Sequence, residues 1–212
     1  MRVYAVADIH GKQDRIRRIR RNVLKFRPDV LVIAGDLTHF TQPARVIAQL
    51  GEMPVPLLAI RGNTDLARVE SLMDRHPNIS SLHLREIRMA GIPFVGVSGT
   101  LPLPFRSQIC LRETQLIERL EPLIRRDSFL IAHPPPWGIL DKVAGRFHAG
   151  CQHLRELIFR RRPAVMICGH IHEQPGLTSL GKTLVINCSM GRAGEGSLID
   201  LDEKGKAKIT ML

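Results

Sequence analysis

The 212-residue chain has few aromatic residues, no long hydrophobic run and a deficit of acidic side chains. Aromatic residues make up only 4% of the sequence, which leaves few rings for stacking nucleic-acid bases and argues against single-strand binding. The longest apolar runs are broken by charge, glycine or proline, so none reaches the roughly 20 residues that a membrane-spanning helix needs. Residues 1–8 already have a strand pattern and leave no room for a signal peptide, so we expect a cytoplasmic protein.

Cysteine is also scarce, and the four cysteines are scattered without any C-x-x-C spacing. A chain of this length can bury enough apolar surface to fold without disulfide bonds. We therefore predict reduced thiols in or near the core at Cys110, Cys151, Cys168 and Cys188.

Basic residues outnumber acidic ones by 31 to 20, which gives a net charge of +11 and favours anionic partners. Residues 15–21 combine arginines with isoleucines at helical spacing, which predicts an amphipathic helix with the arginines on its outer face. Residues 160–162 end another predicted helix, where cations complement the helix dipole. Solvated helix faces account for both runs. The alternative is a positive field that concentrates phosphate-bearing substrates.

The pattern of short apolar runs and amphipathic segments predicts an α/β protein with a single domain over residues 1–212. Strand and helix patterns alternate at first, which favours a parallel, right-handed wound half, and glycine-separated runs after Gly176 predict antiparallel strands. The predicted strands are Arg2–Ala7, Val30–Ala34, Val55–Ile60, Ile92–Val97, Phe129–Ala132, Ala164–Cys168, Thr183–Ile186, Ser197–Leu201 and Ala207–Met211. The predicted helices are Arg15–Phe26, Pro43–Leu50, Leu66–Met73, Glu113–Leu123 and residues 151–160.

Short polar clusters each follow an apolar run of strand length, and they are the most informative feature of the chain. Because ligands bind outside the carboxyl ends of strands in open α/β sheets, these clusters are expected to converge in one crevice. Oxygen and nitrogen donors without a thiolate suit divalent Mn, Fe, Ni, Co or Zn, and so many donors indicate two ions rather than one. The donor residues are Asp8, His10, Asp36, Asn63, His133, His170 and His172.

Taken singly, several clusters have an ordinary structural explanation. Asp8 and Asp36 follow predicted strands, where an aspartate often caps the next helix. Asn63 lies in a predicted turn, where asparagine is favoured because it tolerates left-handed geometry. A loop histidine such as His133 has no packing role to explain it, and a His-x-His pair at a strand end is a plausible metal chelate.

In their order, the motifs D-x-H, G-D, G-N, H and G-H-x-H resemble those of the calcineurin-like metallophosphoesterase superfamily over nearly the whole chain. The resemblance implies a calcineurin-like αββα sandwich of two mixed β-sheets flanked by helices. It implies a first metal held by Asp8, His10, Asp36 and His172. It implies a second metal held by Asp36, Asn63, His133 and His170, so that Asp36 bridges the two. The compact size is similar to the small prokaryotic phosphodiesterases of this superfamily and not to its protein serine/threonine phosphatase branch.

The implied activity is hydrolysis of a small phosphodiester or nucleotide by a hydroxide that bridges two metal ions. Two cations about 3.5 to 4 Å apart can activate a water, orient it toward phosphorus and neutralise the phosphate oxygens. Neutral imidazole and amide ligands leave net positive charge for the phosphate. Asp36, Asn63 and His133 are the predicted catalytic residues, and Mn is the favoured metal, with Fe, Ni, Co and Zn as alternatives. No side chain attacks phosphorus, so we expect no phosphoenzyme.

One motif departs from the family pattern. Many members continue G-N with a histidine that helps to protonate the leaving oxygen, and this chain has Thr64 there. A general acid is worth about 10²- to 10⁴-fold in rate, so its loss favours phosphodiesters with good leaving groups or a proton donor from elsewhere. His39 and His148 are candidate donors, although a surface role explains each. Further candidates are phosphate contacts from Arg61 and Arg106 and a lid, a rim or a simple connection at residues 98–109.

Three functions remain open on the sequence alone. The leading one is a metal-dependent phosphodiesterase acting on a small phosphoester. The second is a catalytically silent metal-binding scaffold for protein partners, which would be expected to lack some ligands, whereas all seven are present. The third is a nuclease, suggested by the positive charge and testable by a steep salt dependence of binding. The sequence predicts neither the physiological substrate nor an oligomeric state.

Overall fold

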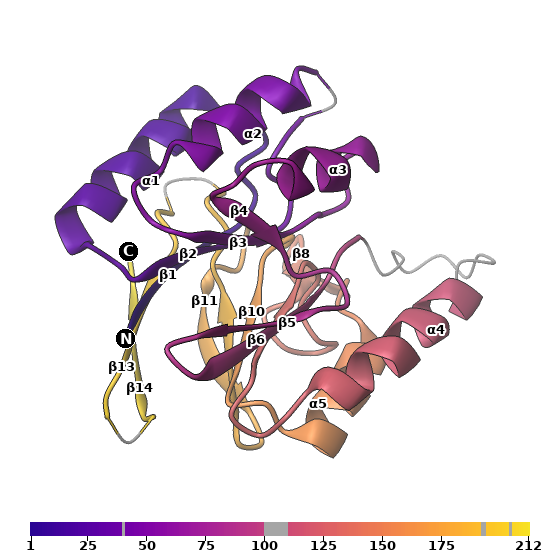
Figure 1. Cartoon of the computed structure of the whole chain (residues 1–212). Helices are drawn as coiled ribbons and strands as arrows, with labels where there is room; N and C mark the ends of the chain where they lie inside the picture. The colour runs from indigo at the N-terminus through magenta and orange to yellow at the C-terminus, as the bar shows by residue number, and fades with distance from the viewer. Residues whose placement is uncertain (40, 100–109, 192–193, 204) are drawn as a thin grey trace.

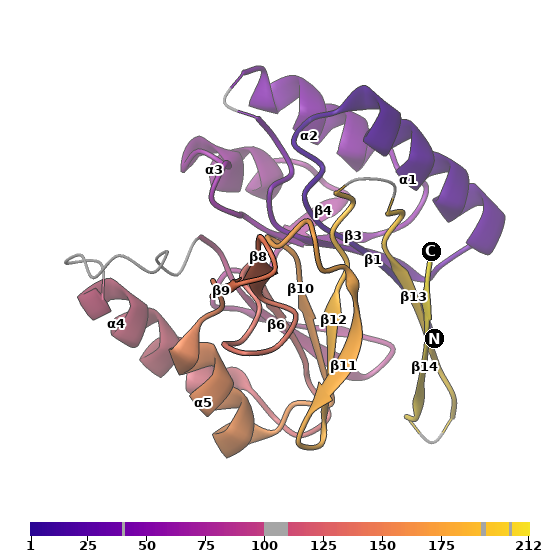
Figure 2. The same cartoon turned by 180° about the vertical axis from the view of Figure 1, so that it is seen from behind.

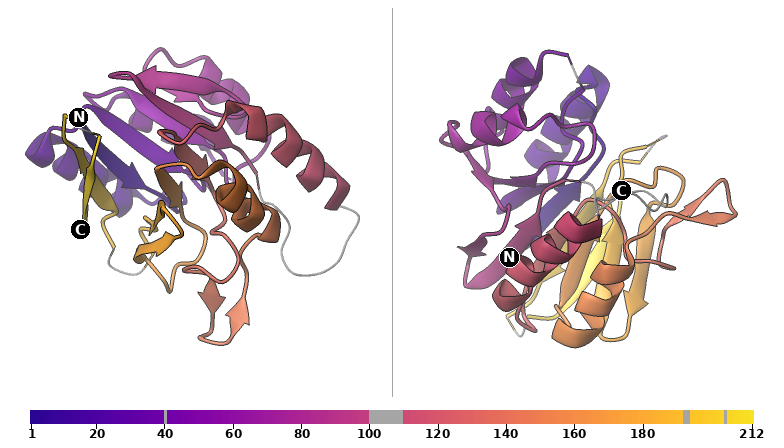
Figure 3. Two further views of the ribbon diagram at one scale, coloured as in Figure 1. Left: turned by 90° about the horizontal axis from the view of Figure 1, so that it is seen from below. Right: turned by 90° about the vertical axis from the view of Figure 1, so that its right-hand side faces the viewer.

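Two mixed six-stranded β-sheets pack face to face between helices. The computed structural model describes residues 1–39, 41–99, 110–191, 194–203 and 205–212, and the side chains of residues 110–113 lie outside that description. Figure 1 shows helices over the outer face of each sheet, and Figure 3 shows the layers from other sides. This arrangement confirms the predicted sandwich of two mixed sheets flanked by helices.

The first sheet contains the wound half that the alternating pattern predicted. Its strand order is β14-β13-β1-β2-β3-β4, and β1 to β4 are parallel. The strands are β1 (Arg2–Val6), β2 (Val30–Ala34), β3 (Leu57–Ile60), β4 (Ile79–Ser81), β13 (Ser197–Leu201) and β14 (Ala207–Met211). Its outer face is covered by α1 (Gln13–Phe26), α2 (Pro43–Gly51) and α3 (Arg68–Asp74).

The second sheet has the order β11-β12-β10-β7-β6-β5, with a parallel centre and antiparallel edge strands. Its strands are β5 (Glu86–Met89), β6 (Ile92–Val97), β7 (Phe129–Ala132), β10 (Val165–Cys168), β11 (Gly176–Leu180) and β12 (Thr183–Asn187). Outside it lie α4 (Cys110–Leu120), the 3₁₀ turn η1 (Glu121–Leu123) and α5 (Gln152–Arg161). A small hairpin, β8 (Lys142–Val143) with β9 (Phe147–His148), extends from this half (Figure 2).

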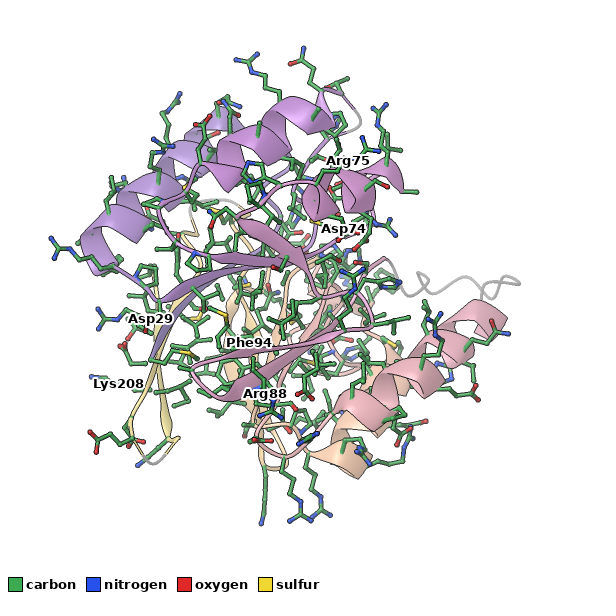
Figure 4. The ribbon with its side chains drawn as sticks, in the orientation of Figure 1. Asp29, Asp74, Arg75, Arg88, Phe94 and Lys208 are labelled. Atoms are coloured by element: carbon green, nitrogen blue, oxygen red, sulfur yellow. The ribbon has the colours of Figure 1, made fainter. Side chains whose placement is uncertain are left out.

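Alternation along the strands divides the buried side chains among three apolar layers. In β1, Tyr4 and Val6 face the first set of helices, whereas Val3 and Ala5 face the second sheet. Phe94, labelled in Figure 4, is fully buried between the sheets. Its ring centroid lies 4.9 Å from that of Phe129. Because both faces of the parallel strands are covered, these strands are continuous apolar runs in the sequence.

The structure corrects several expectations. Four short elements were missed, namely β4, β5, the β8–β9 hairpin and β11, because their strands are short or partly exposed. The strand at Thr183–Asn187 is antiparallel to β11 but parallel to β10, so the last third of the chain is not wholly antiparallel. Cys151, Cys168 and Cys188 are buried, as predicted. The side chain of Cys110, the residue Arg106 and most of the segment predicted as a lid lie outside the described residues.

Arg15 does not lie on the outer face of α1, where the sequence pattern placed it. Its side chain is buried and donates a hydrogen bond to the backbone carbonyl of Asp8. The apolar face of α1, with Ile16, Ile19 and Val23, is buried as expected. Arg15 therefore supports the loop after β1 instead of contributing to surface charge.

Candidate metal centre

All seven predicted donor residues lie in loops at the carboxyl ends of parallel strands, and the structure brings these loops together. Asp8 and His10 follow β1, and Asp36 follows β2. Asn63 follows β3, and His133 follows β7. The pair His170 and His172 follows β10. The loops at the shared edge of both sheets thus collect side chains that are up to 164 residues apart in sequence.

One group consists of Asp8, His10 and His172. The Nε2 atom of His172 lies 3.3 Å from Asp8 Oδ1 and 3.3 Å from His10 Nε2. These three residues offer ligand atoms within 4.8 Å of one another, close enough to hold one metal ion.

A second group surrounds Asn63. Its side-chain oxygen lies 3.0 Å from His133 Nε2 and 3.1 Å from His170 Nδ1. Asp8, Asp36 and His133 also bring ligand atoms within 4.8 Å of one another, and all three are buried. Asp8 therefore approaches the second group as well as the first.

Asp36 lies between the two groups. Its Oδ2 atom is 3.4 Å from His133 Nε2 and 3.7 Å from His10 Nε2. Its Oδ1 atom accepts a 2.8 Å hydrogen bond from the backbone N–H of Thr64, which orients the carboxylate. One carboxylate that faces histidines of both groups is what a bridging ligand requires.

The backbone of the site is strained at the donor residues. Asp8, His10, Asp36 and His170 all have positive φ angles, at 60°, 51°, 53° and 69°. Such left-handed conformations are costly for residues other than glycine, and they persist where the surrounding structure fixes them, often at functional sites. These left-handed residues let each loop turn sharply after its strand, so that the side chain points toward the other donor residues.

The glycine before two of the donors is required by close packing. A Cβ atom on Gly62 would lie 2.2 Å from Asp36 Oδ1, and one on Gly169 would lie 2.3 Å from the Cβ of Ala7. Loops from different strands therefore approach each other as closely as backbone permits. This explains the G-N and G-H motifs by geometry rather than by chain flexibility.

Buried hydrogen bonds set the tautomers of the histidines. His133 Nδ1 lies 2.8 Å from the carbonyl oxygen of Ala34 and donates to it, so Nε2 faces Asp36 and is the nitrogen that would bind a metal ion after losing its proton. The Thr64 hydroxyl donates to the carbonyl of Thr38 at 3.1 Å and lies 3.3 Å from His10 Nδ1. With that Nδ1 as donor, His10 Nε2 also faces the crevice as an acceptor. Histidines that bind metal ions are commonly oriented in this way.

Sequence reasoning missed Asp65, which organises the loops beneath the site. Its buried carboxylate accepts hydrogen bonds from the backbone N–H groups of Leu37, Thr38 and Gly62 and from the Thr38 hydroxyl. The only signal in the sequence was an acidic residue shortly after the G-N motif. Asp65 joins the loop after β2 to the loop after β3 and so positions Asp36 against Asn63.

The carboxylates of the site remain ionised although they are buried. Burial raises the pKa of Asp8, but the hydrogen bond with His172 and the charges of His133 and His172 lower it below its usual value. Burial likewise raises the pKa of Asp36, but the hydrogen bond and charge of His133 lower it well below its usual value. Two buried anions at the centre of the crevice require cations close by.

The pKa values of the four histidines are shifted in different directions. Burial alone would lower the pKa of His133, but its hydrogen bond to Asp36 and the charges of Asp8 and Asp36 raise it to about 9. Burial and the charge of His133 lower the pKa of His170 to about 4. The hydrogen bond with Asp8 raises the pKa of His172, and burial lowers that of His10. The ligand atoms of imidazole, amide and carboxylate groups lie close together, and a donor set of this chemistry fits divalent metal ions that replace the histidine protons.

The remaining candidates from the sequence lie at or beyond the rim. Arg61 donates to Glu70 at 2.8 Å and to the backbone carbonyl of Asp65 at 3.3 Å, and its contact with phosphate stays a prediction. His148 is paired with the buried Asp141 at 2.7 Å and stacks beside Trp137, with ring centroids 5.2 Å apart. His39 is exposed and lines, with His10 and Arg45, a pocket of about 270 Å³ that adjoins the crevice.

Comparison with known proteins matches the sequence to a family and to individual relatives. A family model described as calcineurin-like phosphoesterase matches residues 1–174. The uncharacterized protein MJ1162 of Methanocaldococcus jannaschii is 30% identical over 202 residues, which cover 89% of this chain and 88% of that protein.

Solved structures share the fold. The crystal structure of TT1561 of Thermus thermophilus superposes with a TM-score of 0.71 at 17% identity and covers 99% of this chain and 98% of that chain. A structure described as a novel archaeal phosphodiesterase has a TM-score of 0.57 at 15% identity, and each chain covers 100% of the other. At such low identities these neighbours support the fold and nothing finer.

Proposed function

Since this chain belongs to the calcineurin-like phosphoesterase family, we propose that it is a phosphodiesterase that uses two divalent metal ions held by the seven converging residues. The family supports a metal-dependent hydrolase of phosphoesters. The observation that carries the finer proposal is the pair of donor groups around Asp36, each with acceptor atoms turned toward a common space. No helix in the described part of the chain is long and apolar enough to cross a membrane.

We assign the ligands by these groups. The first ion is held by Asp8, His10, Asp36 and His172. The second ion is held by Asp36, Asn63, His133 and His170. Ions bound there would activate a water for attack on phosphorus and neutralise the phosphate oxygens. Mn is the metal we propose for this mixed set of carboxylate, amide and imidazole ligands, with Fe, Ni, Co and Zn as alternatives.

The protein's own residues supply position and charge. Asp36, Asn63 and His133 are the catalytic residues because their ligand atoms surround the point where both groups meet. Asp65 and the Ala34 carbonyl hold them in place through buried hydrogen bonds. Metal-bound water, not a side chain, is the proposed nucleophile, so we expect hydrolysis without a phosphoenzyme.

A phosphodiester is the favoured substrate. Thr64 occupies the position where many relatives carry the histidine that assists the leaving group, and its hydroxyl is engaged with Thr38 and His10. Loss of a general acid is tolerated best when the leaving oxygen needs little protonation. The pocket with His39 and Arg45 lies beside the proposed first ion and offers space and a cation for the rest of a small phosphoester. The archaeal phosphodiesterase among the structural neighbours agrees with this choice.

The test is hydrolysis of bis-p-nitrophenyl phosphate and p-nitrophenyl phosphate by metal-stripped protein reloaded with Mn, Fe, Ni, Co, Zn or Mg. We expect metal-restored diesterase activity that exceeds monoesterase activity. Asp36→Asn and His133→Gln should each lose at least about 100-fold in rate, because misplaced or missing groups at the reacting centre are costly. His76→Gln is the matched control, since His76 packs against Gly51 between α2 and α3. Bound metal without turnover would contradict the proposal and favour the scaffold function instead.

A further inference from the structure

A second pocket lies at the end of the molecule opposite the metal centre. It has a volume of about 370 Å³ and is lined at the first residues of β7 and β10, Phe129 and Val165, and at the last residue of β13, Leu201. The metal-centre loops follow the other ends of β7 and β10, so the two sites are separated by the length of the strands. Its lining comes from strands of both sheets and includes Lys182, between β11 and β12, and Gly205, between β13 and β14.

The polar part of its lining is cationic. Arg126, Arg162 and Lys182 all line the pocket, and none of the lining residues is acidic. In the part of the chain that the structure describes, none of these three side chains lies in an ion pair. Arg162 alone of the three makes a hydrogen bond there, from Nε to the backbone carbonyl of Phe159 at 3.4 Å. Their side chains are exposed, so their charges are available to a ligand.

More arginines lie beside this pocket. A neighbouring pocket of about 270 Å³ shares Arg126 and is lined also by Arg161 and by Arg125 and Arg160, of which the last two are paired with Glu86 and with Glu121 and Glu156. Asp202, the acidic residue that directly follows the lining residue Leu201, accepts a 2.8 Å hydrogen bond from the backbone of Lys206. Concave surfaces of one sign of charge focus the electric field and concentrate anions.

We propose that this pocket binds a small organic phosphate, of about nucleotide size, as a site distinct from the metal centre. Arginine and lysine are the side chains that recognise phosphate, and three of them in one pocket suit a dianionic or more highly charged group. Apolar side chains, Leu184 and Leu201 among them, complete the lining and suit the uncharged part of such a molecule. The volume lies within the range of roughly 300 to 1,000 Å³ that is typical of small-molecule sites.

The small extent of the pocket distinguishes this ligand from a long polyanion. A nucleic acid would contact charges spread along an open face, whereas here the cations and apolar residues line one pocket. The assignment rests on the pocket alone and holds whether or not the metal centre hydrolyses phosphodiesters.

The experiment is calorimetric titration of the full-length, metal-loaded protein with pyrophosphate and with adenosine 5′-diphosphate. The pocket variant is Arg126→Ala with Lys182→Ala. The matched control is Arg17→Ala with Lys25→Ala, which removes the same charge from exposed positions on α1. Asp36→Asn separates any binding at the metal centre from binding in the pocket. Thermal melting of each variant confirms that it is folded.

We expect binding that survives Asp36→Asn, weakens at least about tenfold in the pocket variant and changes less than about twofold in the control, because charge-assisted hydrogen bonds are lost only there. The adenosine compound should bind more tightly than pyrophosphate, since it also covers the apolar lining. Binding that disappears with Asp36→Asn would assign all of it to the metal centre and overturn the proposal. Equal weakening in the pocket variant and the control would show a diffuse effect of surface charge and would overturn it as well.

Discussion

Replacing Gly62 with alanine puts a methyl group where the structure has no room for one. A Cβ atom at this position would lie 2.2 Å from Asp36 Oδ1 and 2.4 Å from the backbone nitrogen of Asp36. The second contact is with backbone, so rotation of a side chain cannot relieve it. The loop after β2 or the loop after β3 must move by about 1 Å to restore the ordinary contact distance of at least 3.4 Å.

Two effects of different size follow from that movement. Overpacking a tightly packed position costs about 1 to 3 kcal/mol in the free energy of unfolding. For a chain of this length, each kcal/mol lowers the melting temperature by about 2 to 4 °C. A displacement of about 1 Å among reacting groups costs on the order of 100-fold in rate. Gly62→Ala should therefore remain folded and lose most of its activity.

The measurements are thermal unfolding, metal content and the rate with bis-p-nitrophenyl phosphate. Gly176→Ala, in β11, is the matched control, because a Cβ atom added there would have Leu140 Cδ2 as its nearest neighbour, at an ordinary contact distance of 3.6 Å. We expect the control to match the unchanged protein in all three. If Gly62→Ala also matched the unchanged protein in rate and metal content, Asp36 would not need its observed position. The bridging role proposed for Asp36 would then be refuted.

Three further predictions concern the support, the rim and the protonation of the site. Asp65→Ala leaves four hydrogen-bond donors without their acceptor and should lower the free energy of unfolding by about 3 kcal/mol or more. Chemical denaturation measures this loss, and the control Asp127→Ala, at an exposed position, should lose less than about 0.5 kcal/mol. Arg45→Ala removes one cation from the pocket that Arg45 lines with His10 and His39, so KM for a phosphodiester should rise about 3- to 10-fold while kcat stays within about twofold. An unchanged KM would exclude this pocket from substrate binding. The raised pKa of His133, about 9 against 6.5, stabilises the metal-free fold fully below pH 6.5 and is lost as the pH rises through 9. Thermal melting of metal-free protein should show this loss, and His133→Gln should reduce it.

Much of the fold was predictable from the sequence because burial leaves a clear pattern. Strands covered on both faces, such as Val30–Ala34 and Phe129–Ala132, are continuous apolar runs, and the structure has them at the predicted residues. Edge strands carry a weaker pattern, since one face of β5 meets solvent and β4 has three residues. The pairing of β12 with β10 is a contact between distant segments, and no local pattern specifies it.

The donor residues were predictable for a different reason. A carboxylate, amide or imidazole at the end of an apolar run is conspicuous, and the order of the motifs pointed to the family that the comparisons then confirmed. The supporting residues were not conspicuous. Arg15 looks like a surface cation in the sequence because the pattern of α1 says nothing about the loop that its side chain reaches. Asp65 likewise reveals its role only when the loops after β2 and β3 are brought together.

The same packing of two sheets accounts for both sites. At the carboxyl edge, backbone hydrogen bonds join the sheets directly: the N–H of Ala7 donates to Cys188 at 3.1 Å, and that of Met190 donates to Ala7 at 3.0 Å. His133 Nδ1 adds a third link, from the loop after β7 to the end of β2. These links hold the donor loops of different sheets at fixed separations, which a two-metal centre needs because its geometry tolerates little error. At the amino edge, the residues of both sheets line an open pocket instead, and its exposed cations make that edge suited to binding an anion.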